Sequence, residues 1–249
     1  MNMKTLNDLL DAANAESPRK TAYVAPSRQM TFGELYEETA RTAAGLKLAG
    51  VRENDCVAIV HRNAVEFVIT YLALNRLGAV AVPINFMVQK ADELAYMLND
   101  CGAKGVVTQT EFLPGLKSAA AKCPALNYLW VTDATAPDAA TRRFNELRLP
   151  VTEPWPADPA EEGETAAILY TSGTTGFPKG VMLTHGNLLS NAESSIKRMK
   201  LCRNDVGLCI LPMFHSFCWI IILIALRLNL TTVVFANIAP AKPRRHALG

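Results

Sequence analysis

A polar segment rich in hydroxyl groups lies near the middle of the second half of the chain. Residues 170–179 read YTSGTTGFPK, which includes four serine or threonine side chains, two glycines, a proline and a lysine. Gly173 and Gly176 permit backbone conformations that are closed to other residues, and they let the main chain approach a ligand closely. Successive backbone N–H groups in such a turn form a concave nest for phosphate oxygens, and Lys179 adds a positive charge. We therefore predict a phosphate-binding loop, with a flexible polar surface loop as the alternative.

The spacing of this loop differs from two common nucleotide-binding patterns. Gly176 precedes Lys179 by three residues and Gly180 follows it, so the segment is neither GxxxxGK[ST] nor GxGxxG. Its flanks strengthen the phosphate interpretation, because residues 166–170 and 180–185 each read as a strand. A polar turn between two such strands has its ends fixed by the core, as binding loops commonly do. We expect Asn187 to cap the helix that follows.

Composition excludes several other classes of function. The chain has 249 residues, half of them hydrophobic, and a formal net charge of +2, so no charge excess points to nucleic acid or to an acidic membrane surface. The six cysteines form no CxxC pair, and no histidine stands at a zinc-ligand spacing from them. Because the first residues lack a secretory signal, we expect a cytoplasmic protein with free thiols and no metal site of its own.

One apolar run raises the question of a membrane. Residues 217–226 read FCWIIILIAL, about half of the roughly 20 residues that cross a bilayer. We expect a buried core helix here and no membrane span, which leaves peripheral contact with a membrane open.

The remaining pattern predicts an α/β fold with mostly parallel sheets flanked by helices. In residues 31–132, strand-like runs alternate with helical runs of ten to fifteen residues, as in βαβ units. Thr31 and Glu34 form a capping box, Gly50 ends the first of these helices, and Asn63 is placed to cap the next. Residues 133–164 lose this periodicity. We predict a first α/β lobe over residues 1–132, a surface linker over 133–164, and an incomplete second lobe over 165–249 that carries the phosphate loop.

The segment 168–189, ILYTSGTTGFPKGVMLTHGNLL, resembles the signature of the adenylate-forming enzymes. This superfamily includes acyl-CoA synthetases, the adenylation domains of nonribosomal peptide synthetases and firefly luciferase. The resemblance extends to residues 62–85 and 91–104, which look like the N-terminal portion of acyl-CoA synthetases, and to LPMFHSF at 211–217. It implies the N-terminal part of the adenylate-forming fold.

In that family a carboxylate attacks the α-phosphate of ATP, and a thiol, usually coenzyme A, then takes the acyl group. The resemblance implies that His215 lies beside the reacting carboxylate and that Lys179 contributes charge from the loop. Without the resemblance, we would interpret His215 as a core histidine at the end of a strand. The residues that would hold the β- and γ-phosphates are Thr171, Ser172, Gly173, Thr174, Thr175 and Gly176. The implied substrates are ATP, CoA and a carboxylic acid, for which we favour a fatty acid, with Mg²⁺ as the cofactor.

The sequence also departs from the family pattern. It lacks the Tyr-Gly-x-Thr-Glu segment whose glutamate binds Mg²⁺, the ribose-binding aspartate, and the C-terminal domain with its catalytic lysine. We therefore expect a truncated chain. The alternative to an active ligase is a non-catalytic nucleotide-binding remnant, or an inert one that folds incompletely.

Overall fold

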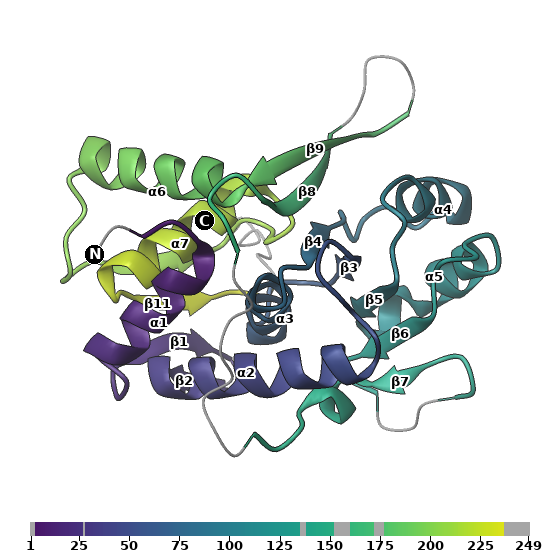
Figure 1. Cartoon of the computed structure of the whole chain (residues 1–249), viewed down its shortest axis with the longest axis horizontal. Helices are drawn as coiled ribbons and strands as arrows, with labels where there is room; N and C mark the ends of the chain where they lie inside the picture. The colour runs from purple at the N-terminus through teal and green to yellow at the C-terminus, as the bar shows by residue number, and fades with distance from the viewer. Residues whose placement is uncertain (1–2, 27, 135–137, 152–159, 172–176, 237–249) are drawn as a thin grey trace, which may run out of the picture.

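The computed structural model describes residues 3–26, 28–134, 138–151, 160–171 and 177–236, and shows two sheets with helices packed around them (Figure 1). The strands are β1 (Thr21–Ala25), β2 (Arg28–Thr31), β3 (Cys56–Val60), β4 (Val80–Pro83), β5 (Gly105–Thr108), β6 (Tyr128–Val131), β7 (Arg142–Arg143), β8 (Thr165–Thr171), β9 (Lys179–Thr184), β10 (Val206–Cys209) and β11 (Thr231–Val234). The α-helices are α1 (Leu6–Glu16), α2 (Phe32–Leu48), α3 (Val65–Arg76), α4 (Ala91–Asp100), α5 (Leu113–Ala120), α6 (His185–Met199) and α7 (Ser216–Leu228). There are also two short 3₁₀ helices: η1 (Thr110–Phe112), between β5 and α5, and η2 (Phe144–Leu147), after β7.

The larger sheet has the strand order β7-β6-β5-β3-β4-β8-β9. Its neighbours pair in parallel, except for the antiparallel pair β8–β9 at one edge. Strands β3, β4 and β5 are buried along their whole length, as expected for strands covered on both faces. The predicted α/β fold with mostly parallel sheets is confirmed.

The smaller sheet has the order β10-β11-β1-β2. Strand β11 pairs in parallel with both β10 and β1, and β2 is antiparallel to β1. Each sheet therefore takes strands from both sides of the predicted linker at 133–164. The division into two lobes stays a prediction of the sequence. Within that linker, Phe144 and Leu147 are buried in the main core, so this part of it is not the surface connection that we expected.

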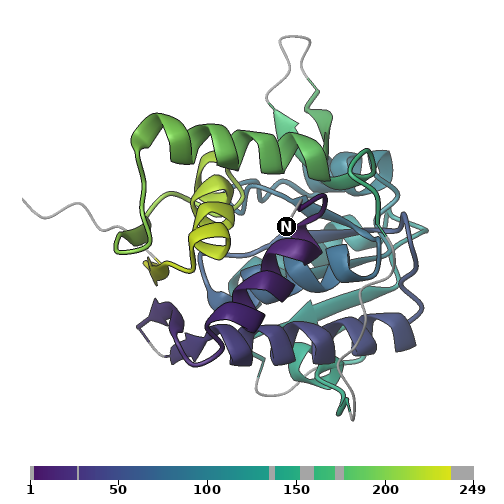
Figure 2. The same cartoon turned by 60° about the vertical axis from the view of Figure 1, so that its left-hand side comes forward.

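Helix α3 lies at the centre of the molecule, between the two sheets (Figure 1). Eleven of its residues are buried, which explains why its sequence is apolar on nearly every side. Helix α7 packs against α6, as the second view shows, and is buried over most of its length (Figure 2). The predicted core helix is thereby confirmed. None of the helices in the described part of the chain is long and apolar enough to cross a bilayer.

Local capping signals were predicted with mixed success. The capping box of Thr31 and Glu34 is present, and Gly50 has a φ of 93°, in the left-handed region. Helix α6 begins at His185 rather than after Asn187, because Thr184 is the N-cap and Asn187 completes its capping box. Asn63 caps nothing: the N-cap of α3 is Ala64, with no side-chain cap bond. Its amide instead bonds a segment about 150 residues away.

Two histidines, His61 and His185, are buried where the charged form of the ring is disfavoured. Leu6 donates its backbone N–H to Nδ1 of His185 over 3.2 Å, and a ring nitrogen that accepts a bond carries no proton. Nδ1 of His61 donates to the carbonyl of Arg62 over 2.6 Å, and Nε2 lies 2.8 Å from the hydroxyl oxygen of Thr132. Burial is the largest cause that lowers the pKa of both rings.

We therefore expect the free energy of unfolding to fall as the pH drops below about 6.5, the pKa of an exposed histidine. Below that pH the unfolded chain binds protons that the folded chain does not, so each histidine costs up to about 1.4 kcal/mol between pH 7.5 and 5.5. Urea unfolding at the two pH values measures the loss. The variant His185→Gln should reduce the pH dependence. Equal pH dependence in wild type and His185→Gln contradicts the assignment.

Candidate functional site

The antiparallel hairpin of β8 and β9 carries the predicted phosphate loop. Thr171 at the end of β8 is paired in register with Lys179 at the start of β9, and its hydroxyl donates to the Lys179 carbonyl over 3.5 Å. Both residues are exposed. The loop residues Ser172, Gly173, Thr174, Thr175 and Gly176 lie outside the described residues. The structure thus fixes the two ends of the loop and their closure by strand pairing.

Helix α4 supports the hairpin from one side. The Tyr170 hydroxyl lies 2.7 Å from the Asp100 carboxylate and 3.0 Å from the carbonyl of Met97, both on α4. Burial and the neighbouring carboxylate raise the pKa of Tyr170. Beyond the loop, the Phe177 ring packs on Tyr96 of the same helix with centroids 5.0 Å apart. Sequence reasoning missed these supports, because nothing in a lone tyrosine at a strand end indicates which helix it meets.

The second predicted segment lies between β10 and α7. His215 is the N-cap of α7 rather than a strand end, and its side chain makes no cap bond and is exposed. Its backbone N–H donates to the Pro212 carbonyl over 3.0 Å. The ring of the preceding Phe214 meets Phe86, which follows β4, edge-on at 5.4 Å. His215 is therefore held through its backbone and its neighbours, and its imidazole faces outward.

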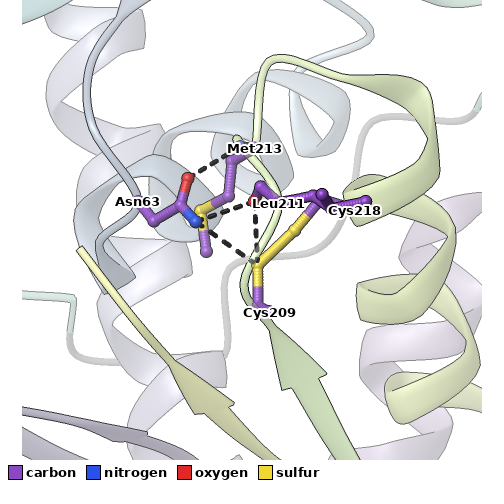
Figure 3. The surroundings of a disulfide bond; sticks show 5 residues. All are labelled: Asn63, Cys209, Leu211, Met213 and Cys218. Atoms are coloured by element: carbon purple, nitrogen blue, oxygen red, sulfur yellow. Dashed lines mark hydrogen bonds between the residues drawn. A yellow bond between two sulfur atoms is a disulfide. The ribbon is translucent and has the colours of Figure 1, made fainter. Parts of the chain in front are cut away.

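A disulfide closes this segment and corrects one expectation. Cys209 at the end of β10 is bonded to Cys218 in the first turn of α7, with Cα atoms 5.9 Å apart (Figure 3). Both side chains are fully buried. All six cysteines were expected to be free, because the sequence shows no secretory signal and no CxxC pair. The turn between strand and helix brings these two together, nine positions apart in the sequence. The remaining cysteines are free: Cys56, Cys101, Cys123 and Cys202.

The two predicted segments meet in one groove of about 490 Å³. Thr171 of the hairpin and Ser216 and Phe217 at the start of α7 all line it. The other lining residues are mostly apolar and come from β8, β9, α6 and α7: Leu169, Val181, Leu183, Asn187, Leu188, Asn191, Ser195 and Ile220. Lys179 and His215 do not line the groove themselves. Each adjoins a residue that borders it, Lys179 through its pairing with Thr171 and His215 through Ser216.

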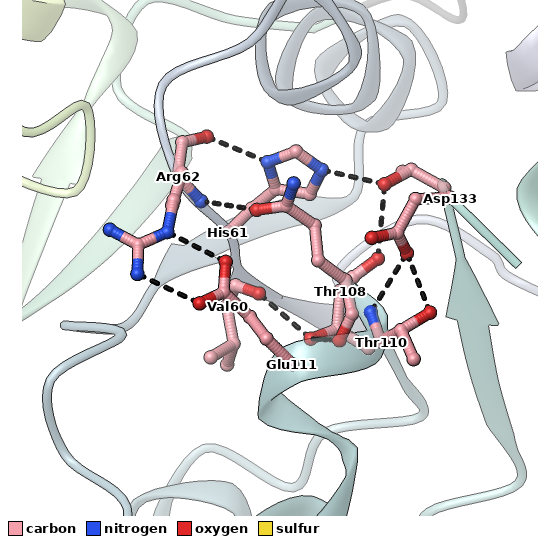
Figure 4. Close-up of polar contacts among 9 residues, drawn as sticks. Val60, His61, Arg62, Thr108, Thr110, Glu111 and Asp133 are labelled. Carbon is pink, nitrogen blue, oxygen red and sulfur yellow. Dashed lines mark hydrogen bonds and ion pairs between the residues drawn. The ribbon is translucent and has the colours of Figure 1, made fainter. Parts of the chain in front are cut away.

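A separate polar network covers the carboxyl ends of β3, β5 and β6 (Figure 4). The Arg62 guanidinium binds Glu111 through two nitrogens at 2.6 and 2.7 Å, which lowers the pKa of that carboxyl. Asp133 accepts from the backbone and hydroxyl of Thr110. These groups bind one another. Among the described residues, no cluster of three or more His, Cys, Asp or Glu side chains is arranged to hold a metal ion.

Comparison with known proteins identifies the family. The model of the AMP-binding enzymes matches residues 10–248, and the chain belongs to this family. Long-chain-fatty-acid–CoA ligase FadD13 of Mycobacterium tuberculosis is 34% identical over 236 residues, which are 94% of this chain and 43% of that protein. 4-Hydroxybutyrate–CoA ligase 2 of Metallosphaera sedula is 31% identical over 218 residues, 84% of this chain and 39% of that protein.

A solved structure agrees with this assignment. The inhibitor-bound N-terminal domain of FACL13 from Mycobacterium tuberculosis matches with a TM-score of 0.85 and 30% identity, over 95% of this chain and 58% of that chain. The resemblance to the N-terminal part of the adenylate-forming fold is confirmed. The chain spans about two fifths of the length of the curated relatives named above.

The contact between Tyr170 and α4 gives a testable prediction. Tyr170→Phe removes the hydroxyl that binds Asp100 and Met97, and should lower the free energy of unfolding by about 1 kcal/mol. Urea unfolding measures this change. Tyr128→Phe, in a strand at the other side of the sheet, serves as a matched control. A loss no larger than that of the control shows that the hydroxyl does not secure the hairpin.

Proposed function

We propose that the chain provides the ATP- and acid-binding part of an AMP-forming acid–CoA ligase, which converts a fatty acid to an acyl-adenylate and then to an acyl-CoA. The observation that carries this proposal is the single groove bordered by Thr171 and by the start of α7. A reaction between ATP and an acid needs the phosphate loop and the acid-binding segment side by side. Positioning of this kind supplies much of the rate enhancement of a bimolecular step.

The family roles are carried over residue by residue. In this proposal Lys179 of the hairpin offsets charge on the transferred phosphates, and His215 at the start of α7 stands beside the reacting carboxylate. The phosphate-binding group is Thr171, Ser172, Gly173, Thr174, Thr175 and Gly176. Support comes from the closure of the hairpin by the Thr171–Lys179 pair, which holds the two ends of the loop together. Donors that are positioned in advance stabilise charge as it develops in a transition state.

The groove favours an apolar acid. Most of its lining is aliphatic or aromatic, and no Lys, Arg, Asp or Glu is among its lining residues. An alkyl chain buried there gains roughly 0.8 kcal/mol for each methylene. The two relatives act, by name, on a long-chain fatty acid and on 4-hydroxybutyrate, so the family alone does not choose the acid. The apolar part of the groove lining supports our proposal of a fatty acid.

The described residues do not form a carboxylate cluster suited to Mg²⁺, and the family's glutamate motif is missing from the sequence. No step of the proposed reaction therefore uses a metal ion held by this chain. CoA enters as the second substrate, after the adenylate has formed. For location we propose the cytoplasm, where ATP and CoA are both present, and we propose neither a nucleic-acid partner nor a membrane span.

ATP–pyrophosphate exchange on the purified chain tests the proposal, with fatty acids of increasing length. We expect exchange that requires the acid and falls about a hundredfold in Lys179→Ala, the cost typical of removing one charge-stabilising group. Lys20→Ala, an exposed lysine in the turn before β1, is the matched control and should keep full exchange. Exchange that is independent of Lys179 contradicts the assigned role.

The alternative function, a nucleotide-binding remnant, predicts a different result. Such a chain binds ATP in equilibrium dialysis, with weaker binding in Lys179→Ala, but exchanges no pyrophosphate with any acid. That outcome rejects the ligase proposal for this chain and retains the phosphate loop.

A further inference from the structure

We propose that Asn63 is a positioning residue for the acid-binding segment. Its side-chain amide fixes residues 211–213, and through them it sets the place of Phe214 and His215. This inference rests on the proposed function for its kinetic consequences, whereas the geometry that it describes does not depend on that function.

The Asn63 amide bonds the backbone of this segment at two points. The Met213 N–H donates to Asn63 Oδ1 over 2.7 Å, and Asn63 Nδ2 donates to the Leu211 carbonyl over 2.8 Å (Figure 3). Asn63 is 5% exposed, so water does not replace these bonds readily. Nδ2 also lies 4.0 Å from the sulfur of Cys209. One side chain therefore satisfies a donor and an acceptor two residues apart, as a neighbouring β-strand would.

An asparagine suits this place better than any residue of similar size. Met213 offers a hydrogen and Leu211 offers an oxygen, so the side chain must both accept and donate. An aspartate has the same shape but presents two acceptors to one donor, and its second oxygen would face the Leu211 carbonyl. Alanine would leave both backbone groups without their partner, and a buried unpaired group costs more than the bond itself contributes.

The Asn63 side chain bonds the 211–213 segment and does not cap the helix that it precedes. It precedes α3, but the N-cap of that helix is Ala64, and Asn63 makes no capping bond. Phe67 and Tyr71 follow Asn63 at intervals of four residues, so they lie on the same face of α3. Both meet Trp219 in the first turn of α7, with centroids 6.4 and 3.6 Å apart. This face thus holds the start of α7, and Asn63 holds the segment leading into it.

The consequence for the site follows from chain connectivity. Met213 is two residues from His215, whose N–H is bonded to Pro212 in the same turn. A shift of Met213 therefore moves His215 and Ser216, the last of which borders the groove. The ends of the phosphate hairpin are held by α4 and by strand pairing instead. Loss of the Asn63 bonds should disturb the acid and spare ATP.

The test uses Asn63→Ala and the isosteric Asn63→Asp, with Asn7→Ala as the matched control. Asn7 is also buried, and it donates to the Asn75 carbonyl, away from residues 211–217. If Asn63→Ala does not fold, Asn63→Asp carries the test. In ATP–pyrophosphate exchange we expect kcat/KM for the acid to fall about ten- to a hundredfold, the effect of a small misplacement, with KM for ATP within about twofold of wild type. Asn7→Ala should keep both constants.

A second readout does not need activity. NMR of the histidine ring protons should show a changed chemical shift for His215 in both Asn63 variants, and no change in Asn7→Ala. In the wild type, a non-hydrolysable acyl-adenylate analogue should shift the Asn63 side-chain amide resonance. If the wild type shows no exchange but His215 responds as expected, the proposed function fails and the positioning role stands. An unchanged His215 signal, or equal losses for acid and ATP, overturns the inference.

Discussion

The architecture depends on the burial of one helix. Helix α3 lies between two sheets with eleven of its residues buried, and no polar group in such a place can rely on water. Its amide donors find their partners in the protein. Asn75 near its end donates through Nδ2 to the Ala166 carbonyl of β8, the strand that leads into the predicted phosphate loop. Asn63 before its start bonds the segment that leads to His215. These two amides tie both candidate functional segments to the two ends of one helix.

The parallel sheet explains why the phosphate loop lies where it does. Strand β8 joins the larger sheet beside β4, and β9 folds back along it at the edge, so the two ends of the predicted loop, Thr171 and Lys179, are paired there (Figure 1). Helix α4 then meets the hairpin on both sides of the loop, through Tyr170 and Phe177. The sequence of the loop is polar and glycine-rich, as close approach to a phosphate requires, and the chain at its two ends is held by apolar and hydrogen-bonded contacts.

Much of this could be predicted from local pattern. Alternating strand and helix periodicity gave the parallel α/β fold, and the length of residues 217–226 separated a core helix from a membrane span. The errors share a physical cause, which is that local signals do not report distant partners. Asn63 looks like a cap because asparagine before an apolar run commonly is one, but its partners lie about 150 positions away. Cys209 and Cys218 lie outside any recognised spacing and are joined by a turn. The pairing of β1 with β11 likewise joins strands that are far apart in the chain, and no local pattern predicts it.

We propose that the hairpin and the start of α7 form one site for the acid and the nucleotide. An NMR titration of the wild-type chain with a non-hydrolysable acyl-adenylate analogue tests this by following Thr171 and Phe217 on the two sides of the groove. We expect both resonances to shift together, with one dissociation constant. Shifts of Thr171 alone, with Phe217 unchanged at saturation, would contradict it and leave a phosphate loop without an acid-binding site beside it.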